Sequence, residues 1–367
     1  MKTRSLLMSI LCSLMIGTSF TACSEDANEV PDTPTIDPVV YGTYILNEGS
    51  WGANDARISL FYHNESSVRK SDIYQDVNGK KMGDVANGML EEDNYIYVVM
   101  NGSKYVSKLD LHCKELARYT FPETDGDPRC MEVEDDFVYI TQYGGKVSKI
   151  NAKDMTLVST FQGGGGNLEG IVEKDGKLYV ANSYQQEGSG NFVYNKEVFV
   201  INAQTMALEK SIEVEVNPTM IREIDGLIYV LSKGDYDILQ TALQVINPND
   251  GSVRYVTNAD KITEGHNGLI YGVRSTFDES WQPTNTLFTY NPNTGVINET
   301  SFLQDAPSAI STTSIYLLEV DKTTGYIYVG TTDYLTNGTI YQFDKQGKFV
   351  KSFDSGGINP STMIFID

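Results

Sequence analysis

The sequence has little of what nucleic-acid or metal binding requires. Only 28 of its 367 residues are lysine or arginine, against 49 aspartate or glutamate, so the formal net charge is −21. A chain with that charge repels phosphate, which argues against nucleic acid or an anionic membrane surface as a partner. The three histidines, His63, His112 and His266, lack the short spacing of a metal site, so we expect them at ordinary surface or turn positions.

The sequence also lacks an apolar run long enough to span a membrane. The longest, from Leu6 to Phe20, follows Lys2 and Arg4, an arrangement typical of a secretory signal. It ends at Phe20-Thr21-Ala22-Cys23, which resembles the lipobox of bacterial lipoproteins, where the cysteine is acylated and becomes the first residue. We therefore predict a signal peptide over residues 1–22 and lipidation at Cys23.

Basic residues are missing from the segment that follows. Residues 24–40 contain three prolines and five acidic residues, a composition that cannot bury a core, so we predict an acylated, acidic tether over 23–40. The run Cys23-Ser24-Glu25-Asp26 resembles the export signal that sends Bacteroides lipoproteins to the outer face of the outer membrane. This resemblance implies a lipid-anchored protein on the cell exterior, which touches the membrane only through its lipid.

Cysteine is scarce, and sustained helical periodicity is absent from the mature chain. Of four cysteines, Cys12 leaves with the signal and Cys23 carries lipid, and we expect Cys113 and Cys130 to remain unpaired because they fall at opposite ends of successive repeats. Glycine (32) and tyrosine (23) are plentiful instead. Turn-forming and strand-forming residues in these numbers favour an all-β fold.

One short apolar strand recurs along the chain. Its tyrosines stand 40 to 57 residues apart, which is the length of one four-stranded propeller blade with variable loops. The seven copies centre on Tyr44, Tyr97, Tyr139, Tyr179, Tyr229, Tyr271 and Tyr328. We predict an all-β, seven-bladed propeller over residues 41–367.

A second series of residues runs in phase with the first. Asp or Asn ends a strand in six repeats, where its side chain can bond the backbone two residues on and start a turn. The six are Asp110, Asn151, Asn202, Asn247, Asn291 and Asp344. The last segment, Asn359–Ile366, resembles Asn217–Ile221, which precedes a tyrosine strand, yet no such strand follows it. We expect the C-terminal strand to close the ring as the innermost strand of the N-terminal blade.

Motifs for catalysis are weak. Gly163–Gly166 is glycine-rich, but no Gly-Lys-Ser/Thr follows it, so it is not a phosphate-binding P-loop. A calcium ion held by carboxylates around the channel, as in propeller lactonases, stays open as an alternative because scattered ligands leave no pattern in the sequence. No catalytic residue, metal ligand or cofactor is assigned.

The informative residues fall in the connections between the second and third strands of the blades. Each of these connections carries an aromatic residue, and both tryptophans are among them. Large rings surrounded by Gly, Asn, Gln and Ser suit a bulky, nearly neutral ligand. The aromatic candidates are Trp51, Tyr105, Tyr143, Tyr184, Tyr194, Tyr236, Trp281 and Tyr334. The polar candidates near the same rim are Asn87, Arg129, Glu169 and Arg274.

The lipobox with Ser24-Glu25-Asp26, the seven tyrosine repeats and the closing Asn-Pro-Ser-Thr-Met strand resemble the YncE-like surface-layer propeller lipoproteins of Bacteroides. Within that family the chain is most similar to the BtuG-type proteins. The resemblance implies capture of vitamin B12 (cobalamin) without chemistry, and docking on a TonB-dependent, BtuB-like outer-membrane transporter. A glycan-binding or glycan-cleaving surface propeller and a lactonase-like metal enzyme are the alternatives.

Overall fold

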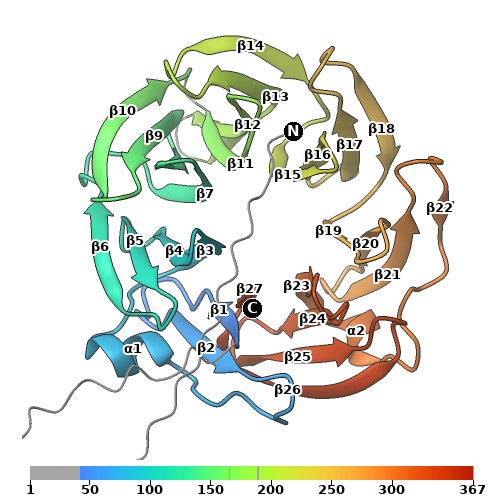
Figure 1. Ribbon diagram of the computed structural model, residues 1–367. Helices are drawn as coiled ribbons and strands as arrows, with labels where there is room; N and C mark the ends of the chain where they lie inside the picture. The colour runs from blue at the N-terminus through green and yellow to red at the C-terminus, as the bar shows by residue number, and fades with distance from the viewer. Residues whose placement is uncertain (1–41, 165, 188–189, 367) are drawn as a thin grey trace, which may run out of the picture. The chain divides into compact units, whose positions relative to one another are not determined.

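Antiparallel hairpins make up almost all of the regular structure. The computed structural model describes residues 42–164, 166–187 and 190–366, and Figure 1 shows this part of the chain as seven sheets, or blades, arranged in a ring in chain order. The predicted all-β, seven-bladed propeller is confirmed. The predicted signal peptide, the lipidated Cys23 and the tether to residue 40 lie outside the described residues.

Blade 1 pairs β2 (Arg57–Phe61), β1 (Thr43–Asn47) and β27 (Pro360–Phe365). The other six blades have four strands each, which Figure 1 shows running from the ring's centre outward in chain order. Blade 2 has β3 (Ala86–Glu92), β4 (Tyr95–Met100), β5 (Tyr105–Asp110) and β6 (Glu115–Thr120); blade 3 has β7 (Pro128–Glu134), β8 (Phe137–Gln142), β9 (Lys146–Asn151) and β10 (Thr156–Gln162). Blade 4 has β11 (Asn167–Lys174), β12 (Lys177–Glu187), β13 (Asn191–Asn202) and β14 (Leu208–Glu213).

Blade 5 has β15 (Pro218–Ile224), β16 (Leu227–Ser232), β17 (Ala242–Ile246) and β18 (Val253–Thr257); blade 6 has β19 (Lys261–Glu264), β20 (Ile270–Phe277), β21 (Pro283–Tyr290) and β22 (Ile297–Asn298). Blade 7 has β23 (Ser314–Val320), β24 (Ile327–Thr332), β25 (Asn337–Phe343) and β26 (Phe349–Ile358). Two short helices, α1 (Ile73–Asn78) and α2 (Ala309–Thr312), lie in connections between blades.

The hydrophobic core is divided into seven clusters, one at each junction between neighbouring blades. All seven repeat tyrosines are buried, and each belongs to the cluster shared with the following blade. Tyr97 of blade 2, for example, packs with Met131 and Val138 of blade 3. In the blade 6 repeat, Gly272 follows the tyrosine because a Cβ there would lie 2.2 Å from the ring of Phe288.

The ring closes as predicted. The last strand, β27, pairs antiparallel with β1, with Thr43 opposite Phe365 and Leu46 opposite Thr362. β1 also pairs with β2, so β27 takes the innermost position of blade 1. The two ends of the chain's folded part therefore share one sheet, and the innermost layer of blades is continuous.

The turn residues act as the sequence indicates. Each Asp or Asn of the second series accepts a hydrogen bond from the backbone N–H two residues on, at 2.9 to 3.1 Å. Cys113 and Cys130 are unpaired, as expected. Within the described residues, no helix has the length and apolar character needed to cross the lipid bilayer.

Candidate functional site

The pairing register brings one set of loops together. In every blade the second strand ends beside the start of the innermost strand: Asn47 opposes Pro360, for example, and Gln142 opposes Pro128. The connections from second to third strands therefore open on the face where all the innermost strands begin, here called the loop face. They comprise residues 48–56, 101–104, 143–145, 233–241, 278–282 and 333–336, together with the β12–β13 hairpin.

Exposed apolar side chains gather on the loop face. Of the seventeen large apolar residues that are exposed in the described chain, ten belong to these loops or to the strand ends beside them. Trp51 and Trp281 are 71% and 78% exposed. The other eight are Phe192, Val193, Tyr236, Ile238, Leu239, Phe277, Tyr334 and Leu335. A concentration of this kind on one face is typical of a binding surface.

A row of tyrosine rings crosses three blades on this face. Tyr143 of blade 3 lies 6.1 Å from Tyr184 of blade 4, measured between ring centroids. Tyr184 in turn lies 6.4 Å from Tyr194, and Tyr194 lies 5.9 Å from Tyr236 of blade 5. Tyr184 and Tyr194 oppose each other across the β12–β13 hairpin, and the hairpin presents both aromatic side chains. These four predicted residues form one surface.

A cavity of about 460 Å³ opens beside that row, here called the face cavity. Four predicted residues, Trp51, Arg129, Tyr143 and Tyr334, line it. Its volume lies within the range of small-molecule pockets. The remaining lining residues are Glu48, Gly49, Ser50, Val85, Asn101, Asp127 and Asn359.

A ring of polar side chains lies beneath the loops. Six of the seven innermost strands have a β-bulge near their first residue, where one extra residue is skipped in the pairing. A bulge re-aims the side chain that it displaces. In blade 6 the unbulged β19 begins with Lys261, which opposes Val273 as Gly88 opposes Val99 in blade 2, one residue after the bulge place. We call the seven residues the bulge ring: Asn87, Arg129, Glu169, Thr219, Lys261, Tyr316 and Ser361.

Charged members of this ring meet near the axis. Arg129 Nε donates to Glu169 Oε2 at 3.0 Å, and its guanidinium lies 5.1 Å from the Tyr143 ring. The hydroxyl of Tyr316 donates to Glu48, from the 48–56 loop. Glu48 feels the charges of Arg129 in blade 3 and of Lys261 in blade 6, on opposite sides of the ring, so its carboxyl lies close to the channel axis. We call Glu48, Arg129, Glu169, Lys261 and Tyr316 the axial cluster.

Burial dominates the electrostatics of the axial cluster. It raises the pKa of Glu48 and of Glu169, although nearby Arg129 opposes both rises. Burial lowers the pKa of Lys261 from its ordinary value of 10.5 to about 8, and the cations Lys233 and Arg222 add to that effect. Charge in this cluster is therefore costly in the free protein, which is a feature shared by many binding and catalytic sites.

Three aromatic residues of the loop face have strained backbones. Tyr236, Trp281 and Tyr334 have φ values of 61°, 60° and 64°, in the left-handed region that bulky side chains rarely adopt. Such conformations cost about 1 to 3 kcal/mol each and concentrate at functional sites. These three aromatic side chains are exposed and do not belong to the core.

Eight of the twelve predicted residues lie outside the lining of the face cavity. Four of these eight belong neither to the tyrosine row nor to the axial cluster: Tyr105, Arg274, Trp281 and Asn87. Tyr105 is a correction: it is only 3% exposed, its hydroxyl donates to the carbonyl of Met82, and its ring lies in the core between blades 1 and 2. It is the first residue of β5, and strand alternation directs its side chain into that core. The 101–104 loop therefore presents no aromatic ring.

Arg274 lies outside the lining of the face cavity. Its guanidinium bonds Thr257 at 2.8 Å and the carbonyl of Asn258 at 3.1 Å, and pairs with Glu299 at 3.3 Å. These partners lie at the end of β18 in blade 5, in the connection to blade 6 and directly after β22. Trp281 lies on the loop face against Phe277, outside the lining of the face cavity, and Asn87 lines the central channel.

Sequence reasoning missed Glu48, Lys261 and Tyr316. Aligning the starts of the innermost strands would have found Tyr316, because it occupies the bulge place of Arg129 and Glu169 in its own blade, whereas Lys261 lies one residue after that place. Glu48 carries no such signal, since its role depends on a loop that reaches the axis.

The central channel continues below the bulge ring, with a volume of about 1190 Å³. Carboxylates gather where the innermost strands end, and burial together with Glu134 and Glu173 raises the pKa of Glu132 to about 8. Among the described residues, no group of three or more His, Cys, Asp or Glu side chains is arranged to hold a metal ion.

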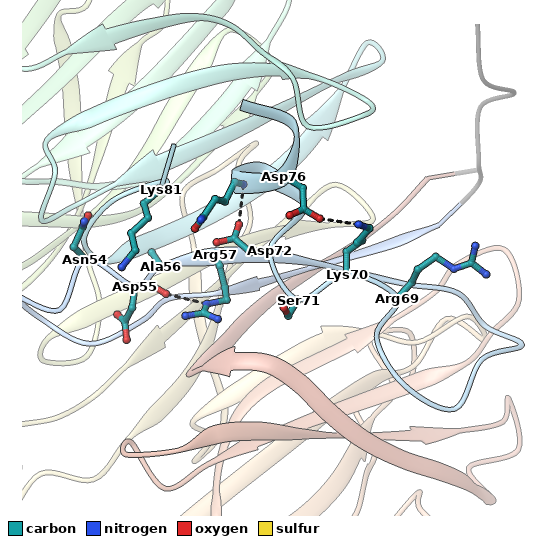
Figure 2. Close-up of a pocket in the computed structure, with 11 residues that line it drawn as sticks. Asn54, Asp55, Ala56, Arg57, Arg69, Lys70, Ser71, Asp72, Asp76 and Lys81 are labelled. Atoms are coloured by element: carbon teal, nitrogen blue, oxygen red, sulfur yellow. Dashed lines mark hydrogen bonds and ion pairs between the residues drawn. The ribbon is translucent and has the colours of Figure 1, made fainter. Parts of the chain in front are cut away.

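A third cavity, of about 400 Å³, lies on the side of blade 1 beside α1. Figure 2 shows Lys70 paired with Asp76 at 2.9 Å, while Arg57 donates to the backbone carbonyl of Asp55 at 3.2 Å. Arg69, Lys70 and Lys81 are exposed to solvent. The cavity is a solvated surface pocket that borders the 48–56 loop through Asn54, Asp55 and Ala56.

Replacing the strained aromatic residues by glycine tests whether they serve the fold. We expect Tyr236→Gly and Trp281→Gly each to keep or raise the free energy of unfolding, by up to about 1 kcal/mol, because glycine adopts a positive φ without strain. Urea denaturation measures this. Tyr255→Gly, in the outer strand β18, is the control and should destabilise. A loss above about 1 kcal/mol at 236 or 281 would show that these rings are structural.

The buried lysine predicts a pH dependence. Because the pKa of Lys261 is lower in the folded chain, the unfolded chain binds the additional proton between about pH 8 and 10.5, so this group's contribution to stability rises with pH. We expect Lys261→Met to be more stable than the wild type at pH 7, by about 1 to 3 kcal/mol, and this advantage to shrink by pH 10. Urea denaturation at both pH values measures it, with Lys153→Met, an exposed lysine in the β9–β10 turn, as control. A constant difference would contradict the assignment.

Comparison with solved structures shows the fold. A putative 6-phosphogluconolactonase from Bacteroides uniformis ATCC 8492 is similar with a TM-score of 0.61 and 13% identity, over 89% of this chain and 100% of that one. The computationally designed Ika8 protein has a TM-score of 0.52 and 12% identity, over 87% and 89% of the two chains. U3-55K has a TM-score of 0.52 and 10% identity, over 73% and 81%. At these identities the likeness concerns the fold alone.

No curated protein matches the sequence. A family model, described as a domain of unknown function (DUF5074), matches residues 41–365. Because this match spans the whole propeller, the chain belongs to the DUF5074 family.

Proposed function

We propose that the chain captures cobalamin on its loop face, without altering it, and passes it to a TonB-dependent outer-membrane transporter. The observation that carries the proposal is the gathering of ten exposed apolar side chains on the loop face, where the face cavity opens. An exposed apolar surface is costly in a free protein and is usually covered in the working state.

The dimensions favour a ligand larger than the face cavity. The row from Tyr143 to Tyr236 and the exposed rings of Trp51 and Trp281 extend well beyond a cavity of about 460 Å³. A flat macrocycle that bears peripheral amides can cover the rings with its apolar surface. Its amides can bond polar groups that line the cavity.

Capture needs binding groups and no reactive ones. The axial cluster has its acids tied up, Glu169 with Arg129 and Glu48 with Tyr316, which leaves neither free to act as a base on a ligand. A lactonase-like activity has no comparable observation in its favour, since the likeness to the putative 6-phosphogluconolactonase is one of fold.

Titration with cyanocobalamin tests the proposal. We expect saturable binding by calorimetry and a change in the corrin absorption spectrum. Trp51→Ala and Trp281→Ala should each weaken binding about tenfold or more, as buried aromatic anchors do. Tyr255→Ala, an exposed aromatic on the outer strand β18, should change the affinity less than about twofold. No heat, no spectral change and no co-elution with the wild-type chain would refute cobalamin capture.

Anchoring and transfer need a separate experiment on whole cells. The proposal places the propeller outside the cell, on the acidic tether that follows Cys23. We expect the wild-type protein to fractionate with the outer membrane, to be cleaved by protease added to intact cells, and to co-purify with a TonB-dependent transporter. Cys23→Ala should abolish membrane association because the acylated sulfur is lost. Wild-type protein that resists protease on intact cells would contradict the location.

A further inference from the structure

Arg129 offers hydrogen-bond donors to the face cavity, which it lines. Its Nε donates to Glu169 Oε2 at 3.0 Å, and its guanidinium lies 5.1 Å from the centre of the Tyr143 ring. Within the described residues its two Nη atoms make no hydrogen bond. The bond to Glu169 and the contact with Tyr143 restrict the planar guanidinium, so its remaining N–H groups are held beside the cavity.

Glu48 offers an acceptor to the same cavity. Its Oε2 accepts from the Tyr316 hydroxyl, whereas Oε1 accepts no hydrogen bond in the part of the chain that the structure describes. Burial raises the pKa of Glu48, and the charges of Arg129 and Lys261 oppose that rise, so both cations lie near its carboxyl. The cavity thus places donors from blade 3 and an acceptor from blade 1 within reach of one ligand group.

The charges that line the cavity are already matched. Arg129 pairs with Glu169 at 3.0 Å, and Asp127 pairs with Lys104 at 3.1 Å. Glu48, the remaining charged residue of the lining, lies near two cations. A ligand group with a net charge would enter without a counter-charge, and its desolvation would be uncompensated. The cavity therefore suits a neutral group that both accepts and donates hydrogen bonds.

We propose that Arg129 and Glu48 select a primary carboxamide on a side arm of the ligand, whose oxygen accepts from Arg129 Nη and whose NH₂ donates to Glu48 Oε1. The inference rests on the proposed function for the ligand and on the face cavity for the group that is recognised. Accepting from an amide N–H needs no proton transfer, so this role of Glu48 agrees with capture without chemistry.

Other polar groups match the two residues less well. A carboxylate has acceptors only and would place negative charge beside Glu48, whereas an ammonium has donors only and would place positive charge beside Arg129. A hydroxyl uses one oxygen for both roles. An amide has its acceptor and its donors on separate atoms, which suits two protein groups that approach from different blades.

Monocarboxylic acids derived from cyanocobalamin test the inference. Mild acid hydrolysis converts one propionamide of cyanocobalamin into a carboxylate, and the resulting isomers can be separated. By calorimetry, we expect one isomer to bind the wild-type chain about tenfold or more weakly than cyanocobalamin, and the others to lose less than about threefold. Equal affinities of all the isomers would overturn the inference while leaving cobalamin capture in place.

Two variants separate the donor from the acceptor. Arg129→Lys keeps the pair with Glu169 but removes the additional donors, so cyanocobalamin should bind about tenfold or more weakly. Arg254→Lys, in the outer strand β18, is the matched control and should leave the affinity unchanged. Glu48→Gln keeps an acceptor without the charge, so it should lose most of the discrimination against the disfavoured isomer. Unchanged affinity in Arg129→Lys, or unchanged discrimination in Glu48→Gln, would overturn the assigned roles.

A second measurement does not depend on corrinoids. Of the chain's two tryptophans, Trp51 lines the face cavity and Trp281 does not, so their indole ¹H–¹⁵N signals, assigned with Trp51→Phe, report on the cavity and on the rest of the loop face. Propionamide should shift the Trp51 signal and leave the Trp281 signal in place. Propionate, propylammonium and 1-propanol at equal concentration should shift it less than about half as much.

The outcomes of this measurement distinguish the two proposals. Equal shifts of the Trp51 signal with all four compounds, or no shift with propionamide, would overturn the selection of an amide. Failure of cyanocobalamin binding together with a selective propionamide shift would refute cobalamin capture alone.

Discussion

The ring depends on the packing of one tyrosine from each blade against the blade that follows. All seven of these tyrosines are buried in the clusters between blades, and some tie the blades by hydrogen bonds as well. The Tyr44 hydroxyl, for example, donates to the carbonyl of Leu111 in the next blade at 2.7 Å. A blade alone would expose this face, so each sheet is stable only beside its neighbour. Pairing of β27 with β1 extends the same condition across the chain ends. The loops of the loop face are thereby held at fixed positions, although they contribute little to the core.

The bulges convert this scaffold into a site. A regular strand would direct alternate side chains to the two neighbouring blades, whereas an extra residue near the start of the innermost strand re-aims one side chain in each blade. In blades 3 and 4 the re-aimed residues are Arg129 and Glu169, which meet across the blade boundary at 3.0 Å. In blade 7 it is Tyr316, which meets Glu48 from a loop of blade 1. Side chains from distant parts of the sequence thus converge near the axis because six blades repeat the same bulge. The residue type at the bulge differs from blade to blade.

The fold was predictable because its determinants are local and repeated. The tyrosine strands, the Asp and Asn turns and the orphaned last strand each leave a pattern, and the structure confirms all three. The loop face was predictable to the level of loops, since hairpin connectivity alone places them at one end. Individual side chains were not. Tyr105 lies at the end of a predicted loop and Arg274 near the predicted rim, but strand alternation directs Tyr105 into the core, and Arg274 bonds Thr257 and the carbonyl of Asn258. Lys261 was missed because its strand has no bulge and no repeat pattern, so only the spatial alignment of the innermost strands identifies its place.

The loop face concentrates features that destabilise the free protein. Three aromatic residues have left-handed backbones, ten large apolar side chains face water, and burial lowers the pKa of Lys261. None of these features is needed to close the ring, whose seven interfaces are packed independently of them. Under the proposed function, a ligand that covers the apolar surface offsets their cost. A catalytic centre would combine such costs with a free acid or base positioned at the reacting atoms. Here the central carboxyls are bonded to Arg129 and Tyr316, an arrangement that favours the proposed capture of a ligand over a chemical step.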